Sequence, residues 1–243
     1  MYIAIPLHHM NTQAQVYLIP CPLAPDALHT IPTYVLNAIK QCTVYYVENE
    51  RTTRRYFKQL YKDMVIDDYS WHTIHKAEHA VLAQFKKDVL QGLSIGLVSE
   101  AGCPAIADPG SVLVQAAQEL QATIHPLVGP SSILLALMGS GFTGQAFTFN
   151  GYLPIDAAER NTAIKALETK ATQQLVTQLF IETPYRNNAL LQSLLKSCAP
   201  TTKLCIAANL TAPNASIITK TIANWKLENL DYHKQPVIFI LGK

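Results

Sequence analysis

The chain has little charge, no long apolar run and no pair of cysteines with metal-type or redox-type spacing. Charged residues make up 15% of its 243 residues, against 49% hydrophobic ones. This balance excludes a disordered protein, because there is ample apolar material for a packed core. The net charge of +2 permits a nucleic-acid partner without indicating one, since dedicated nucleic-acid binders are usually more basic. A chain of this length is typical of one large or two medium α/β domains.

The cysteines are odd in number, and no two of them form a C-x-x-C pair. They are Cys21, Cys42, Cys103, Cys198 and Cys205. We expect reduced, mostly buried thiols in a cytoplasmic protein. The longest strongly apolar stretch, Ile133–Met138, is far shorter than the ~20 residues that span a membrane. Residues 1–11 carry no basic segment ahead of their apolar residues, so no signal peptide is expected.

Two common catalytic motifs, the G-x-S-x-G elbow and the P-loop, are absent. The segment Gly139–Gly144 does match the dinucleotide-binding pattern G-x-G-x-x-G. That fingerprint must follow a strand and open a helix, whereas this sequence predicts a helix before it and a strand after it. We therefore interpret these glycines as a helix end and a turn.

A histidine-rich segment raises the question of a metal. His75 and His79 have helical i, i+4 spacing, and His72 lies close by. Glu78, however, is misplaced for the H-E-x-x-H pattern, and no thiolate or fourth ligand has suitable spacing. No metal is therefore expected.

Strand-like and helix-like segments alternate along the chain. Strands are expected at 16–20, 43–47, 94–98, 123–127, 147–150, 175–181, 203–208 and 236–241. Helices are expected at 32–40, 52–61, 78–91, 111–120, after a cap at Ser131 or Ser132, and at 156–169 and 184–197. Such alternation predicts mainly parallel, helix-covered sheets. Two runs of it indicate two α/β domains, 1–126 and 127–243, with a cleft between them.

The loop at 99–110 follows the third expected strand. Ligands bind beyond the carboxyl ends of strands in open α/β sheets, and small residues such as Ala101 and Gly102 let a ligand approach the backbone. Glu100 and Asp108 are the acids of this loop. A rigid turn in which Asp108 caps the following helix is the alternative interpretation, and the sequence leaves both open.

The turn Gly129–Ser132 lies between an expected strand and a helix start. Free N–H groups and the hydroxyls of Ser131 and Ser132 could hold a carboxylate there. Ordinary helix capping explains the same residues, and the two roles are compatible.

A run of basic residues lies on one expected helix. Arg51, Arg54, Arg55, Lys58 and Lys62 are three, four or seven residues apart, which places them on one face. Such a face suits a nucleic-acid phosphate backbone, but it is also typical of a solvated helix surface.

Five short motifs occur in one order along the chain. They are Leu97-Val-Ser-Glu-Ala-Gly-Cys-Pro104, Asp108-Pro-Gly110, Pro126-Leu-Val-Gly-Pro-Ser131, Asn150-Gly-Tyr-Leu-Pro154 and Phe180-Ile-Glu-Thr-Pro-Tyr-Arg186. The tetrapyrrole-methylase superfamily has Ser-Asp-Ala-Gly-Thr-Pro, Asp-Pro-Gly, Pro-Gly-Pro, Gly-Phe-Leu-Pro and Tyr-Glu-Ser-x-His-Arg at these points. Over about residues 15–243 the chain resembles this superfamily, and within it the ribosomal RNA cytidine 2′-O-methyltransferases.

The resemblance implies two α/β domains with mainly parallel or mixed sheets and S-adenosylmethionine in a cleft between them. It implies a methyltransferase acting on the ribose 2′-O of a cytidine in small-subunit ribosomal RNA, in a cytoplasmic protein that forms a homodimer. The positions that match the cofactor site are Pro22, Ala101, Gly102, Cys103, Ile106, Ser131, Ser132, Glu182 and Leu210.

Methyl transfer from a sulfonium needs alignment of nucleophile and methyl group, and a ribose hydroxyl also needs a base. Candidate bases by location are Glu48, Glu78, Glu100, Asp108 and Glu182. We expect Glu100 and Glu182 to be catalytic. We expect Arg51, Arg54 and Arg186 to contact RNA phosphate.

The chain also departs from the family pattern. Pro-Ile-Gly-Asn becomes Pro22-Leu-Ala-Pro25, Glu-Asp-Thr-Arg becomes Glu48-Asn-Glu-Arg51, Asn-Glu becomes Ala77-Glu78, and Arg-Glu-Leu-Thr-Lys becomes Ala208-Asn-Leu-Thr-Ala212. The last change removes three charges, so methyl transfer is better supported than the RNA substrate. Two alternatives follow: a non-catalytic relative that binds cofactor or RNA, and a methylase of a tetrapyrrole or another small molecule.

Overall fold

The computed structural model describes residues 13–74 and 78–243. The described residues divide into two compact units: the first holds residues 13–22, 28–74 and 78–130, and the second holds residues 23–27 and 131–243. The expected domains, 1–126 and 127–243, stay a prediction. The compact units differ from them in two places, because Leu127–Pro130 belongs to the first unit and Leu23–Ala27 to the second.

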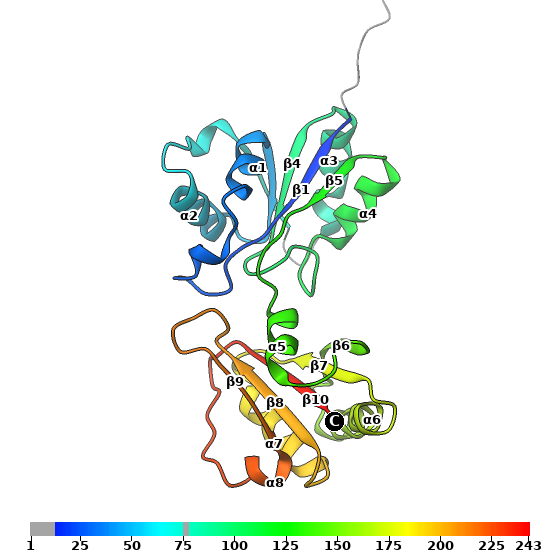
Figure 1. Ribbon diagram of the computed structural model, residues 1–243. Coiled ribbons are helices and arrows are strands. Elements are labelled where there is room, and N and C mark those ends of the chain that lie inside the picture. Colours follow the sequence, from blue (N-terminus) through cyan, green and yellow to red (C-terminus); the bar gives the residue numbers. More distant parts are fainter. Residues whose placement is uncertain (1–12, 75–77) are drawn as a thin grey trace, which may run out of the picture. The chain divides into compact units, whose positions relative to one another are not determined.

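The first unit is built on a sheet of five strands in the order β3-β2-β4-β1-β5, all of them parallel (Figure 1). The strands are β1 (Gln15–Ile19), β2 (Val44–Val47), β3 (Ser70–Thr73), β4 (Ser94–Val98) and β5 (Thr123–Pro126). The helices are α1 (Val35–Gln41), α2 (Glu50–Leu60), α3 (Glu78–Leu90) and α4 (Ser111–Glu119), with short 3₁₀ turns at Leu28–Thr30 and Ile66–Asp68. Because the strands are parallel, their carboxyl ends share one edge of the sheet.

Helices cover both faces of this sheet, which is why its inner strands are almost wholly apolar. On one face Tyr46 meets Phe85 of α3 edge to face, with the ring centroids 5.0 Å apart. On the other face Tyr45 meets Phe57 of α2 in the same way, also at 5.0 Å. Adjacent residues of β2 thus serve opposite cores, as the two-residue period of a strand requires.

The second unit has a mixed sheet in the order β6-β7-β10-β8-β9. Only β6 and β7 pair in parallel, and the other neighbours pair antiparallel. Its strands are β6 (Phe147–Tyr152), β7 (Thr177–Ile181), β8 (Lys203–Ala208), β9 (Ser216–Thr221) and β10 (Val237–Gly242). Its helices are α5 (Ser132–Ser140), α6 (Ala157–Thr172), α7 (Asn187–Ser197) and α8 (Ile222–Trp225).

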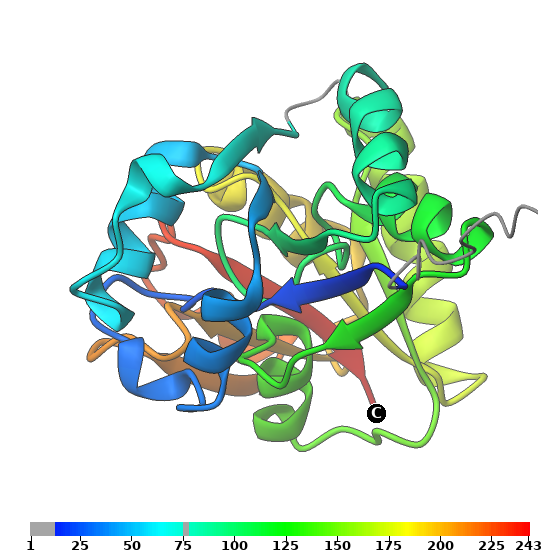
Figure 2. The same cartoon turned by 90° about the horizontal axis from the view of Figure 1, so that it is seen from above.

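The core of the second unit also lies on both faces of its sheet. Phe180 and Phe239 stack at 6.0 Å on the face that α6, α7 and α8 cover. On the other face Leu179 and Ile240 pack against α5 through Ala136. Figure 2, which views the structure from above, shows the helices α6 and α5 in yellow-green and green.

Most expected elements are present with shifted ends, and some expectations were wrong. The helix expected from Pro32 begins at Val35, because residues 32–34 form a turn in which Val35 N donates to Pro32 O at 3.1 Å. The strands β3 and β9 and the helix α8 were not expected. The first sheet is parallel and the second is mixed, which confirms the fold class of mainly parallel or mixed sheets.

The glycine motif has the structure expected of it. Helix α5 ends at Ser140, and Gly141 follows in the left-handed conformation with φ 76°, as a helix-capping glycine does. Residues 1–11, His75 and Ala77 lie outside the described residues, as do the side chains of Glu78 and His79. Within the described ranges, no helix has the length and apolarity needed to cross a membrane.

Candidate active site

Three loops at the carboxyl edge of the first sheet are joined by short contacts. Cys21, after β1, and Gly102, after β4, exchange two backbone hydrogen bonds of 2.8 and 3.0 Å. The thiol of Cys103 lies 3.6 Å from the carbonyl oxygen of Pro130, after β5. Burial raises the pKa of this thiol, so it stays protonated and can donate. The edge therefore holds a connected group of loops at the position where α/β sheets bind ligands.

These loops carry several of the residues expected at a cofactor site. They are Pro22, Ala101, Gly102, Cys103 and Ile106. The loop after β4 has unusual backbone conformations, because Ala105 and Ala107 have φ values of 64° and 62°. Left-handed conformations are costly for residues with a Cβ and persist where the surrounding structure fixes them. Between these two alanines Ile106 is 54% exposed.

The loop after β5 packs directly on the loop after β1. A Cβ on Gly129 would lie 2.1 Å from Cβ of Pro20, so only glycine fits there. Just beyond, Ser131 is the N-cap of α5, and its Oγ accepts from Leu134 N at 3.5 Å. Ser132 is the first residue of that helix. The capping interpretation of Ser131 is confirmed, and its compatible ligand role stays a prediction.

Three acids gather at the same edge of the first sheet. The backbone N–H of Glu100 donates to Oε2 of Glu48 at 2.9 Å, and Thr52 Oγ1 lies 3.5 Å from Oε1 of Glu100. Burial, followed by the charges of Glu48 and Glu100, raises the pKa of Asp108 to about 6. The N-cap residue of α4 is Gly110, so Asp108 does not hold the N-cap position itself. The interpretation in which Asp108 serves the start of this helix stays a prediction.

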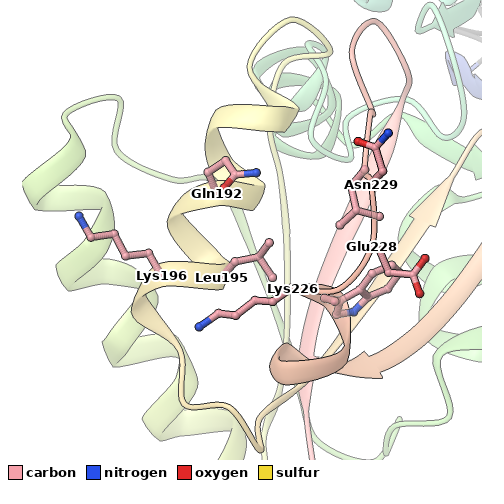
Figure 3. A pocket seen from close by; sticks show the side chains of 8 residues that line it. Gln192, Leu195, Lys196, Lys226, Glu228 and Asn229 are labelled. Atoms are coloured by element: carbon pink, nitrogen blue, oxygen red, sulfur yellow. The ribbon is translucent and has the colours of Figure 1, made fainter.

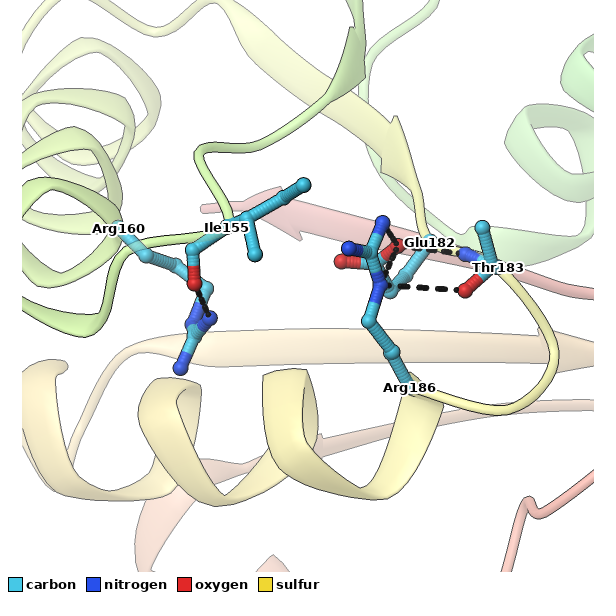
Figure 4. Close-up of polar contacts among 5 residues, drawn as sticks. All are labelled: Ile155, Arg160, Glu182, Thr183 and Arg186. Carbon is cyan, nitrogen blue, oxygen red and sulfur yellow. Dashed lines mark hydrogen bonds and ion pairs between the residues drawn. The ribbon is translucent and has the colours of Figure 1, made fainter.

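The second unit holds a buried carboxylate beyond β7. Glu182 is 6% exposed, and its Oε1 accepts from the backbone N–H of Thr183 at 2.6 Å. Nη2 and Nε of Arg186 reach the same oxygen at 2.6 and 3.0 Å (Figure 4). Figure 4 shows the guanidinium turned toward Glu182 rather than away from it. Glu182 is thus held in one orientation, and much of the donor capacity of Arg186 is already used.

A second unusual backbone segment follows β8. Asn209 and Thr211 have φ values of 52° and 70°, and Leu210 between them is buried against α5. The amide of Asn209 donates to Oε1 of Gln235 at 2.7 Å. Among the described residues, Thr211 Oγ1 is buried without a hydrogen-bond partner. A buried hydroxyl with no partner is costly, so this atom is suited to a ligand group. Sequence reasoning missed it, although it adjoins Leu210.

The basic run on α2 does not form one uniform face. Arg54 pairs with Glu50 at 2.5 Å and lies over the ring of Trp71, 5.1 Å from its centroid. Lys58 donates to the carbonyl oxygens of Lys62 and Met64 at 2.6 and 3.0 Å, beyond the helix end. The exposed Arg51 and Arg55 form no ion pair with described residues.

The described part of the histidine-rich segment shows no metal site. The ring of His72 stacks on Tyr46, with the ring centroids 4.8 Å apart. Within residues 13–74 and 78–243, no group of His, Cys, Asp and Glu side chains could hold a metal ion.

The cysteines are free thiols, and Cys103 alone among them is not buried. Burial raises the pKa of Cys198 to about 12 and that of Cys205 as well, so these thiols are unreactive. This agrees with the expectation of buried thiols.

A pocket of about 370 Å³ lies elsewhere in the second unit, between α7, α8 and the segment that follows α8 (Figure 3). Its lining includes Lys196 on α7, Lys226 after α8, and Trp225. None of the residues expected to bind cofactor or RNA lines it. Its mouth is formed largely by exposed polar side chains, which is not typical of a cofactor site.

The family model of the tetrapyrrole (corrin/porphyrin) methylases matches residues 16–225. The ribosomal RNA small subunit methyltransferase I of Micromonospora olivasterospora is 31% identical over 179 residues, which cover 74% of this chain and 54% of that protein. The protein of the same name from Vibrio cholerae is 30% identical over 196 residues, covering 81% and 65%. This chain therefore spans less than two thirds of the length of these two relatives.

Solved structures agree on the fold. The methyltransferase CobJ superposes with a TM-score of 0.64 at 16% identity, over 95% of this chain and 94% of that one. The uroporphyrin-III-C-methyltransferase from Thermus thermophilus superposes with a TM-score of 0.55 at 15% identity, over 95% and 93%. The family consists of methyltransferases that use S-adenosylmethionine. The chain belongs to the tetrapyrrole (corrin/porphyrin) methylase family.

Proposed function

We propose that this chain is an S-adenosylmethionine-dependent methyltransferase that methylates ribosomal RNA of the small subunit, at the ribose 2′-O of a cytidine. Family membership supports the methyl transfer, and the names of the relatives support the RNA substrate. The observation that carries the proposal is the joining of the family's loop motifs at one sheet edge through Cys21, Gly102 and Cys103. The proposal includes a homodimer and a cytoplasmic location, where ribosomal subunits are found.

The described residues fit the cofactor in kind. The loop after β4 offers backbone groups and small side chains at Ala101 and Gly102, and Ile106 offers an exposed apolar side chain. In the second unit Thr211 offers a buried hydroxyl without a partner, next to Leu210. We propose that the loop residues Ala101, Gly102 and Ile106 bind S-adenosylmethionine. The other proposed contacts are Pro22, Cys103, Ser131, Ser132 and Glu182. The bound cofactor would supply an activated methyl group.

The protein's own contribution is positioning and proton removal. Holding the ribose hydroxyl in line with the methyl group can supply roughly 7–11 kcal/mol. A base must also take the hydroxyl proton. Asp108 is well suited, since a carboxyl with a pKa of about 6 is mostly ionised at neutral pH and is more basic than an ordinary aspartate. Glu100 and Glu182 remain catalytic candidates, with Glu182 favoured as a positioning residue because its Oε1 accepts three hydrogen bonds.

The expected phosphate contacts differ in their availability. Arg51 is exposed and suited to an RNA phosphate. Arg54 and Arg186 already pair with Glu50 and Glu182, so each would have to share its guanidinium with the phosphate. We therefore assign the phosphate role first to Arg51.

Calorimetric titration with S-adenosylmethionine is the first test, on the wild type and on Ser131→Trp, which adds a bulky ring where Ser131 is expected to bind. Micromolar binding that the variant loses supports the cofactor site. Incubation of small ribosomal subunits with radiolabelled cofactor then tests methyl transfer. Cofactor binding without RNA methylation would support a non-catalytic relative or a small-molecule methylase. The uncharged residues Ala208, Asn209 and Ala212 favour the non-catalytic alternative.

A further inference from the structure

An exposed aromatic side chain stands next to the Glu182–Arg186 pair. Tyr185 is 70% exposed, although it immediately precedes Arg186 and lies just beyond the carboxyl end of β7. The family motif given above has histidine at this position, whereas this chain has tyrosine. Tyrosine is enriched at binding interfaces, because its ring is apolar and its hydroxyl group is polar.

The ring of Tyr185 is flanked by residues from a distant part of the chain. The ring of His233 meets it at 5.7 Å between centroids, with the planes at 72°. The ammonium group of Lys234 lies 6.0 Å from the centroid of the Tyr185 ring. We call Tyr185, His233 and Lys234 the aromatic platform. It combines a π face with the ammonium group of Lys234, and proteins hold single-stranded nucleic acid by these two features.

The segment that supplies His233 and Lys234 is anchored independently of Tyr185. Lys234 N donates to Pro184 O at 2.9 Å. Asn187, which is fully buried, donates through Nδ2 to Gln235 O at 2.7 Å. Asn188 Nδ2 donates to Asp231 Oδ1 at 2.8 Å.

The anchoring also fixes a costly backbone conformation. Lys234 has a φ of 60°, which is unusual for a residue with a Cβ. The segment is therefore held in place before any ligand arrives, and removal of the Tyr185 ring should not unfold it.

We propose that the aromatic platform binds an unpaired nucleobase of the RNA substrate by stacking on Tyr185, with Lys234 contacting the adjoining phosphate. This inference rests on the proposed function. Arg186, the residue that follows Tyr185, contacts Glu182, so the aromatic platform adjoins the Glu182–Arg186 pair in sequence. Base–aromatic stacking is sequence-tolerant, and its loss lowers affinity between about fivefold and about 150-fold per base.

The test measures the affinity of the full chain for two single-stranded RNA oligonucleotides of equal length, one with bases and one abasic. The wild type should bind the strand with bases more tightly. Tyr185→Ala should lose that preference, and Tyr185→Phe should keep it, because the ring is retained. Phe147→Ala is the matched control, since this exposed aromatic residue starts β6 and lies at the opposite end of the parallel β6–β7 pair. Lys234→Gln should weaken binding of both strands and flatten the salt dependence.

Three results would overturn the proposal: no base preference in the wild type, equal loss in Tyr185→Phe and Tyr185→Ala, or the same loss in Phe147→Ala. Intact oligonucleotide binding by Tyr185→Ala with weaker binding to whole small subunits would also overturn it, in favour of a protein partner. Methylation of small subunits is measured in parallel. If the wild type methylates small subunits but shows no base preference, only the stacking proposal is wrong. If it shows base preference but no methylation, only the proposed function is wrong.

Discussion

The backbone N–H of Glu100 donates a 2.9 Å hydrogen bond to the carboxylate of Glu48. This contact joins the loop after β4 to the end of β2 and gathers two negative charges beside Asp108. Burial and these two charges raise the pKa of Asp108 to about 6. A neutral Asp108 relieves the repulsion among the three acids, so the protonation state of one side chain affects the stability of the whole loop group.

We expect the free energy of unfolding to fall, on account of Asp108, as the pH rises from about 4 to about 6. The pKa of Asp108 is raised from its ordinary 3.8 to about 6, so the folded state binds more protons than the unfolded state in this window. Asp108→Asn should remove this pH dependence and raise the melting temperature at pH 7 by about 2–4 °C. Melting curves between pH 4 and pH 7 measure both effects. Asp63→Asn, at an exposed acid, is the control. If the melting temperatures of the wild type and of Asp108→Asn changed with pH in the same way, the expectation would be contradicted.

Gly129→Ala should destabilise the chain by about 1–3 kcal/mol and weaken cofactor binding. The added Cβ would lie 2.1 Å from Cβ of Pro20, so the loops after β1 and β5 must move apart. Gly144→Ala is the matched control, because its Cβ would meet only Leu137 at an ordinary 3.9 Å. Chemical denaturation and cofactor titration give the two quantities. Equal stability of the two variants would show that the loops are not tightly packed.

The Glu182–Arg186 pair should show a coupling free energy of roughly 1–3 kcal/mol in a double-mutant cycle of Glu182→Gln and Arg186→Gln. Glu182 is buried, and its loss leaves the guanidinium without its ion-pair partner. The exposed pair Lys220–Glu228 has the same 2.6 Å distance and should give less than about 1 kcal/mol. Denaturant unfolding of the single and double variants measures each cycle. Similar values for the two pairs would mean that burial of Glu182 adds nothing.

Arg51 and Arg54, three residues apart, should respond differently to substitution. Arg51→Gln should weaken binding to small-subunit RNA and lower the salt slope by about 0.7–0.9, with no change in melting temperature, because its side chain is exposed. Arg54→Gln should cost about 1 kcal/mol of stability through loss of the Glu50 pair and the Trp71 contact. RNA binding at several salt concentrations measures the phosphate contact, and thermal melts measure the change in stability. The opposite pattern would reverse the assignment of phosphate contact to Arg51.

The inner strands of the two sheets could be predicted from the sequence. Helices cover both faces of these strands, and their residues are therefore almost all apolar. The strands Ser94–Val98 and Lys203–Ala208 have the predicted bounds. The missed strands β3 and β9 each form one edge of their sheet, whereas β5 and β6, at the other edges, were predicted. The residues of β3 and β9 are partly exposed and include Ser70, His72 and Lys220, so no apolar run marks them.

The candidate site was predictable in its loops but not in its pairings. Position at strand ends and small residues pointed to the loop after β4, whereas the left-handed Ala105 and Ala107 have no sequence signal, since alanine rarely adopts that conformation. The pairing of Glu50 with Arg54 follows the i, i+4 spacing of a helix, whereas Glu182 and Arg186 lie before α7, where that spacing predicts no contact.

The short segment Leu23–Ala27 has a practical consequence for cutting the chain into fragments. It belongs to the second unit although the first unit surrounds it in sequence, and Leu23 packs against the cluster around Ile133 and Leu137. A fragment that starts at Ser131 would therefore lack part of its own core and expose apolar surface in the host cell. The two units are interleaved along the polypeptide, so neither can be expressed whole as one uninterrupted piece that excludes the other.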